Sequence, residues 1–118
     1  MPVRNIRRRY IHIIIETYSE PREHDINETI QNSIKTLFGL KGLSSIDPIL
    51  ISYNEKTKQG IIRCRHTGIN NLRAALAYTK LINDKAAAIR VDQVSGTIKK
   101  LKLKTKELDK VNDTEKID

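Results

Sequence analysis

Arginine and lysine residues gather in three stretches of the chain, and their spacing suits binding to phosphate groups. Arg63 and Arg65 occupy alternate positions of residues 61–66, so they project from the same face of the expected strand. Arginines precede a second apolar segment, and lysines alternate with apolar residues near the C-terminal end. Each lysine alone would usually be a solvated surface residue, but the clusters together point to an RNA. We expect RNA contacts from Arg7, Arg8, Arg9, Arg63, Arg65, Lys99, Lys100, Lys102 and Lys104.

The histidines and the cysteine do not form a pattern typical of catalysis. His12, His24 and His66 fall in different predicted elements, and no acidic residues recur at metal-ligand spacing. Cys64 is the one cysteine, which excludes an intrachain disulfide and leaves a cysteine-based zinc site unsupported. We interpret Cys64 as a small buried residue rather than a nucleophile. No catalytic residue and no metal ligand are therefore expected in this chain.

The elements that would position these residues follow from hydrophobic periodicity and turn residues. Strands are predicted at residues 10–15, 49–53, 61–66 and 88–94, and the last one could continue past Gly96 through a bulge. A first helix is predicted from about Ile26 until Gly39 and Gly42, and a second from about Ile69 to Asn83. The order is strand, helix, strand, strand, helix, strand. This order predicts an α+β, ferredoxin-like (RNA-recognition-type) fold, with a four-stranded antiparallel sheet and both helices on one face.

Charge divides the chain of 118 residues into two parts. The formal net charge is +8, but residues 106–118 carry three lysines and five acids and so are acidic. We predict one RNA-binding domain over residues 1–105, with a basic N-terminal arm, and a flexible or short helical tail over residues 106–118. The excess charge could instead serve only solubility. With five aromatic residues in all, contacts with RNA should be mainly electrostatic rather than by base stacking.

Neither a signal peptide nor a run of about 18 apolar residues is visible in the sequence. Together with the single cysteine, this predicts a cytoplasmic protein. Apolar side chains left on the sheet face away from the helices would need a protein partner to cover them. We expect that partner to contact Tyr10, His12 and Ile14.

Several segments resemble one known family in the order in which that family carries them. These are Arg8 to Ile11, Tyr53 and Asn54 with Thr57, the GIIRC motif at residues 60–64, Arg73 to Leu76, and Ile89 to Val91 followed by VSGTIKK at residues 94–100. The chain resembles the archaeal ribonuclease P protein component 2 family, which is similar to the Pop-five subunit of eukaryotic ribonuclease P and of the mitochondrial-RNA-processing ribonuclease.

The resemblance implies a non-catalytic protein subunit of a ribonucleoprotein endonuclease, one that removes the 5′ leader from precursor tRNA. Ribonuclease P RNA with its Mg²⁺ ions would do the chemistry. The implied partners are that RNA, precursor tRNA within the holoenzyme, other ribonuclease P protein subunits, and above all component 3, in a pair or a heterotetramer.

Other functions stay open at this point. The chain could be a stand-alone basic RNA-binding module, or a small-ligand regulatory domain that dimerises through its sheet. An acylphosphatase-like hydrolase would need a glycine-rich phosphate cradle before the first helix, and residues 20–25 contain no glycine.

Overall fold

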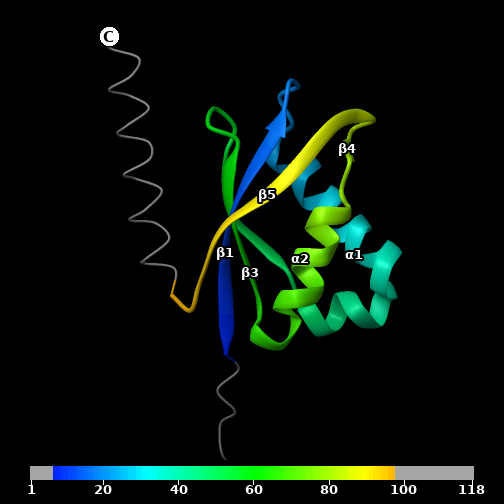
Figure 1. Cartoon of the computed structure of the whole chain (residues 1–118), viewed down its shortest axis with the longest axis vertical. Helices are drawn as coiled ribbons and strands as arrows, with labels where there is room; N and C mark the ends of the chain where they lie inside the picture. Colours follow the sequence, from blue (N-terminus) through cyan, green and yellow to red (C-terminus); the bar gives the residue numbers. More distant parts are fainter. Residues whose placement is uncertain (1–6, 98–118) are drawn as a thin grey trace, which may run out of the picture.

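The computed structural model describes residues 7–97, which form one antiparallel sheet with two helices on the same side (Figure 1). The sheet has five strands in the order β2-β3-β1-β5-β4. The elements are β1 (Arg8–Thr17), α1 (Glu23–Ile46), β2 (Ile49–Asn54), β3 (Gln59–Arg65), α2 (Ile69–Tyr78), β4 (Leu81–Ile82) and β5 (Lys85–Ser95). The four lysines predicted at residues 99–104 and the predicted tail at 106–118 lie outside the described residues.

Four of the strands and the two helices have the predicted ferredoxin-like order. The prediction of a four-stranded sheet missed one strand, because the sheet has five. The extra strand, β4, pairs with the start of β5 at Leu81 and Ile82. Asn83 and Asp84 both have positive φ (53° and 63°), the conformation that a tight hairpin turn requires. The second helix therefore ends at Tyr78, several residues before the predicted end.

The hydrophobic core lies between the sheet and the helices. Ile11, Ile13 and Ile15 alternate along β1 toward the helices and are buried. They belong to one cluster with the helix residues Ile26, Ile30, Ile34, Leu72, Ala75 and Leu76. The isoleucine side chains suit a pleated surface and fix which face of β1 is turned away from the helices.

Helix α1 begins earlier and ends later than the sequence predicted. It starts at Glu23 rather than near Ile26, because Asp25 accepts a hydrogen bond from the Arg22 N–H (3.0 Å) and completes the first turn. Gly39 has φ 72° and kinks the helix, as expected of a breaker, but helical turns resume and continue to Ile46.

A bulge changes the register with which β5 pairs with the central strand β1. The pairing shifts between His12 and Ile13 of β1: His12 lies opposite Gln93 of β5, and Ile13 lies opposite Val91. The residue between them, Asp92, is the extra one. This bulge was not predicted: the expected one was at Gly96, where β5 has already ended at Ser95, and residues from 98 onward lie outside the described part of the chain.

Candidate nucleic-acid interface

Arg63 and Arg65 lie on the sheet face that points away from the helices, as their alternation with Ile62 and Cys64 predicted. Arg63 pairs across the sheet with Tyr10, and Arg65 with Arg8. Both arginines are half-buried, and their Nε atoms are buried without a hydrogen-bond partner. The side chains are still partly exposed, and a guanidinium matches the geometry of a phosphate.

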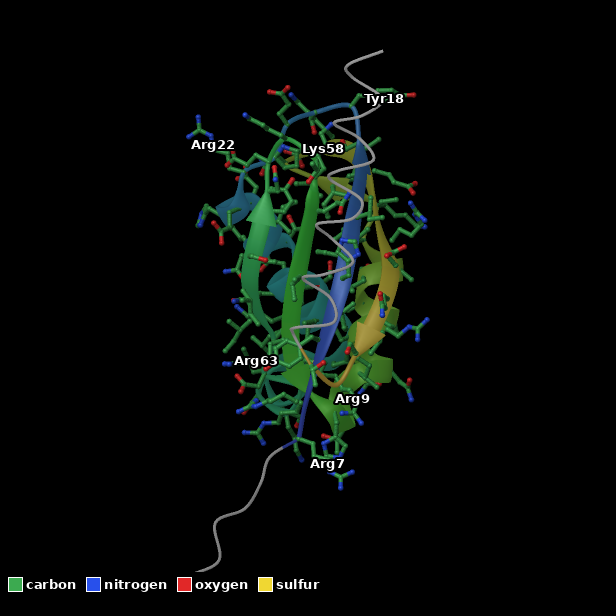
Figure 2. The ribbon with its side chains drawn as sticks, turned by 90° about the vertical axis from the view of Figure 1, so that its left-hand side faces the viewer. Arg7, Arg9, Tyr18, Arg22, Lys58 and Arg63 are labelled. Carbon is green, nitrogen blue, oxygen red and sulfur yellow. The ribbon has the colours of Figure 1, made fainter. Side chains whose placement is uncertain are left out.

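The basic arm meets this pair at one end of the sheet. Figure 2 shows Arg7, Arg9 and Arg63 at the same end, opposite to Tyr18 and Lys58. The carbonyl of Arg7 accepts a hydrogen bond from the His66 N–H (3.0 Å), which ties the arm to the end of β3. Two of the three predicted basic clusters are therefore side by side, and the third is outside the described residues.

The arginines of the arm are not equivalent. The Arg8 guanidinium lies 3.1 Å from a carboxylate oxygen of Asp47, so part of its charge is already matched within the chain. Arg9 alternates onto the helix side of β1, opposite Cys64, and its guanidinium passes near Gly96. Arg7 is exposed. Contact of each with RNA stays a prediction, with Arg8 the least available of the three.

The expected partner-binding residues Tyr10, His12 and Ile14 share this open face, but His12 is only 1% exposed. Its Nδ1 lies 2.9 Å from Oδ2 of Asp92, and its Nε2 lies 3.0 Å from Oε1 of Gln59. Both ring nitrogens are thus occupied within the chain. We interpret His12 as a support of the face; Tyr10 and Ile14, which are half-buried, are the better candidates for contact.

Cys64 is fully buried in the core, in agreement with its interpretation as a small packing residue. Burial raises the pKa of the Cys64 thiol to about 11, although the charges of Arg8 and Arg9 act in the opposite direction. Among residues 7–97, no three His, Cys, Asp or Glu side chains come together as a metal site. No helix in this part of the chain is long and apolar enough to cross a membrane.

Sequence reasoning missed the residues that hold the interface in place. Asp92 reaches His12 only because the bulge inserts it into β5, and Asp47 reaches Arg8 from the end of α1. The one available signal was the polar pair at residues 92–93 between the apolar residues Val91 and Val94.

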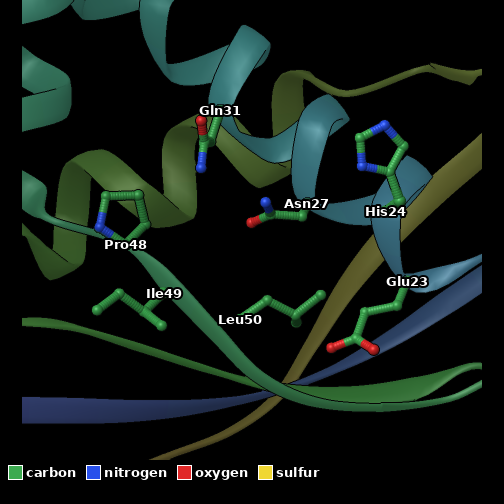
Figure 3. A pocket seen from close by; sticks show the side chains of 7 residues that line it. All are labelled: Glu23, His24, Asn27, Gln31, Pro48, Ile49 and Leu50. Atoms are coloured by element: carbon green, nitrogen blue, oxygen red, sulfur yellow. The ribbon is translucent and has the colours of Figure 1, made fainter.

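A polar groove of about 440 Å³ lies between α1 and β2 (Figure 3). It is lined by Glu23, His24, Asn27, Gln31, Pro48, Ile49 and Leu50. None of the predicted RNA-binding residues lines it, so it is separate from the basic end.

Comparisons with known proteins agree with the fold. The model of the Rpp14/Pop5 family matches residues 9–106. Over 103 residues the chain is 34% identical to ribonuclease P protein component 2 of Pyrococcus furiosus, with 87% of this chain and 86% of the relative covered. The protein of the same name from Pyrococcus horikoshii is 35% identical with the same coverage. The one from Saccharolobus islandicus is 30% identical over 95 residues, covering 80% of this chain and 66% of the relative.

A solved structure gives the same architecture. One chain in the cryo-EM structure of yeast ribonuclease MRP superposes with a TM-score of 0.66, over 97% of this chain and 98% of that one. The two sequences are 12% identical, so this likeness concerns the fold.

Proposed function

The chain belongs to the Rpp14/Pop5 family, and we propose that it acts as a protein subunit of ribonuclease P. In this role it helps the catalytic RNA to remove the 5′ leader from precursor tRNA. Relatives named ribonuclease P protein component 2 support the proposal, since they match most of the chain.

The observation that carries the RNA-binding role is the pair Arg63 and Arg65. Their buried Nε atoms lack acceptors, and they lie at the end of the sheet where Arg7 and Arg9 also lie. Both arginine side chains are only half-buried, so a phosphate oxygen could meet their guanidinium groups, and binding it would release counterions from the RNA. We propose that this end of the sheet is the RNA contact.

In this proposal the protein supplies positive charge and the RNA supplies the chemistry. Mg²⁺ would be bound by the RNA, and the arginines would lower the repulsion between phosphates that must approach each other around those ions. The protein would then reduce the Mg²⁺ concentration at which the RNA folds and cleaves.

A protein partner would occupy the open face beside the arginines. Tyr10 and Ile14 are half-buried there, next to the buried network of His12, and would offer an apolar contact of limited area. We propose ribonuclease P protein component 3 as that partner, in a pair or a heterotetramer. The cytoplasmic location stays a prediction.

The test is reconstitution with ribonuclease P RNA and component 3, with cleavage of precursor tRNA measured against Mg²⁺ concentration. We expect cleavage at low Mg²⁺ only when this chain is present, and its loss in the double variant Arg63→Glu, Arg65→Glu. The matched control is Lys35→Glu, Lys41→Glu, which changes the charge equally at exposed positions of α1. A chain that binds RNA but never alters cleavage would instead be a stand-alone RNA-binding module.

A further inference from the structure

Tyr18 is a fully exposed aromatic residue in the loop between β1 and α1. Figure 2 shows it at the end of the sheet away from Arg7 and Arg63. An exposed phenol ring leaves a large apolar surface in water, and such rings are common at binding sites for bases and proteins. This end of the molecule has no part in the RNA contact described above.

The backbone on both sides of Tyr18 is fixed. The Thr17 hydroxyl donates to the carbonyl of Ala86 (2.8 Å), and the hydroxyl oxygen of Thr17 also lies 3.0 Å from that of Ser19. The Lys58 ammonium donates to the carbonyl of Thr17 (2.8 Å). The backbone that carries Tyr18 is therefore held by β5 and by the turn before β3.

A hollow of about 510 Å³ lies beside the ring. This is within the range typical of small-ligand sites, about 300–1,000 Å³. Alanines 86–88 contribute to its lining, together with Thr17 and Lys80. Alanine side chains are small, so a flat group can approach the backbone of β5 closely while Tyr18 borders its other side.

The charged groups of the hollow favour an anion. Glu16, the one acid in its lining, forms an ion pair with Arg90 (2.8 Å). Lys80 is exposed and has no ion pair within the described part of the chain. A flat apolar group with a negative charge attached is the ligand that an aromatic ring beside a free lysine recognises, and an RNA nucleotide has that form.

We propose that this hollow binds one unpaired nucleotide of an RNA, with the base stacked on Tyr18 and its phosphate near Lys80. The proposal rests on the proposed function, because it adds a second RNA contact to the same subunit. It also supplies the base stacking that the open sheet face, with Arg63 and Arg65, does not provide. The two contacts lie at opposite ends of the sheet, so they would engage separate segments of the RNA.

The test uses the full chain and an oligouridine of about ten nucleotides, a length within the range of single-strand site sizes. One uridine is replaced by 4-thiouridine, and the photo-crosslinked residue is identified by mass spectrometry. We expect the crosslink at Tyr18, and about a fivefold or larger loss of affinity in Tyr18→Ala. Tyr18→Phe should retain the wild-type affinity, because the ring persists.

The matched control is Tyr78→Ala, which removes another exposed tyrosine, on α2, and should leave affinity unchanged. Wild-type affinity in Tyr18→Ala, or crosslinks confined to other segments, would overturn the hollow as an RNA site. If the hollow binds a protein instead of RNA, Tyr18→Ala should likewise keep the wild-type affinity for oligouridine. Ribonuclease P reconstitution separates the two proposals. If the wild-type chain stimulates cleavage and Tyr18→Ala binds oligouridine as tightly as the wild type, only the nucleotide site is removed. If Tyr18→Ala loses oligouridine binding but the wild-type chain does not stimulate cleavage, the nucleotide site stands and only the subunit role is removed.

Discussion

Nδ1 of His12 on β1 lies 2.9 Å from Oδ2 of Asp92, the bulged residue of β5. Nε2 of the same ring lies 3.0 Å from Oε1 of Gln59 on β3, so one buried side chain links the three strands that carry the open face. Which ring nitrogen donates depends on the tautomer of His12 and on the orientation of the Gln59 amide. The network fixes the surface on which Arg63 and Tyr10 stand.

Replacing His12 by Leu should reduce the free energy of unfolding by about 1–3 kcal/mol, because the side chains of Gln59 and Asp92 lose a buried hydrogen-bond partner. Urea unfolding followed by circular dichroism measures the change. His24→Leu is the control: that histidine is 83% exposed and its ion pair with Glu28 lies on the surface, so its effect should stay within about 0.5 kcal/mol. Equal stability of His12→Leu and the wild type would remove the network as a structural support.

Reversing the charge of Arg63 and Arg65 should weaken binding to ribonuclease P RNA and flatten its salt dependence. Each phosphate contact contributes to the slope of log affinity against log salt, so losing two should lower its magnitude by about 1.5–2. Fluorescence anisotropy across a salt series measures the slope, and circular dichroism checks that the fold is intact. The Lys35→Glu, Lys41→Glu variant has the same net charge and should keep the wild-type slope. A slope unchanged in the arginine variant would exclude the open face as the RNA contact.

Cys64 should resist alkylation in the folded protein. Its thiol is buried and its pKa is raised to about 11 by that burial, so near pH 8 only about a thousandth of it is thiolate. Iodoacetamide labelling followed by mass spectrometry should show almost no product in buffer and complete labelling in concentrated urea. Fast labelling of the native chain would mean that the β3 core opens readily.

The sequence predicted the elements that depend on local periodicity. Alternation in residues 61–65 correctly separated the arginines from the core residues Ile62 and Cys64. It did not find β4, because Thr79 and Ile82 continue the helical spacing of the second helix's buried residues; both are buried in the structure. In the structure Thr79 ends the helix, with its hydroxyl 2.8 Å from that of Ser33 on α1. This contact between distant segments is invisible to a local pattern.

Long-range geometry also explains what the sequence left out of the interface. The bulge that brings Asp92 to His12 shifts the register of β5 against β1, which no single strand encodes. The ion pair of Arg8 with Asp47 joins β1 to the end of α1. Residue type and spacing thus located the positive charge, while contacts between distant segments, such as the ion pair of Arg8 with Asp47, determine how much of it is already matched within the chain.

The start of α1 makes stability depend on pH. The backbone N–H of Arg22 and then the side chain of Asn83 hold the pKa of the Asp25 carboxyl below its ordinary value of 3.8. Because the folded pKa is the lower one, the stabilisation is present above the unfolded value and disappears as pH falls through the folded pKa. Asp25→Asn keeps the shape but removes the charge, so it should lower the melting temperature by a few degrees near neutral pH.

The melting temperatures of wild type and Asp25→Asn should therefore converge on acidification. Thermal unfolding followed by circular dichroism from about pH 6 down to about pH 2 tests this, since the difference should shrink only below the ordinary carboxyl pKa. Glu55→Gln is the control, because this exposed acid in the turn before β3 caps no helix and should leave the pH profile unchanged. A difference between Asp25→Asn and wild type that persists at the lowest pH would mean that the substitution acts by something other than loss of the carboxylate charge. The early start of α1 at Glu23 would then need another cause.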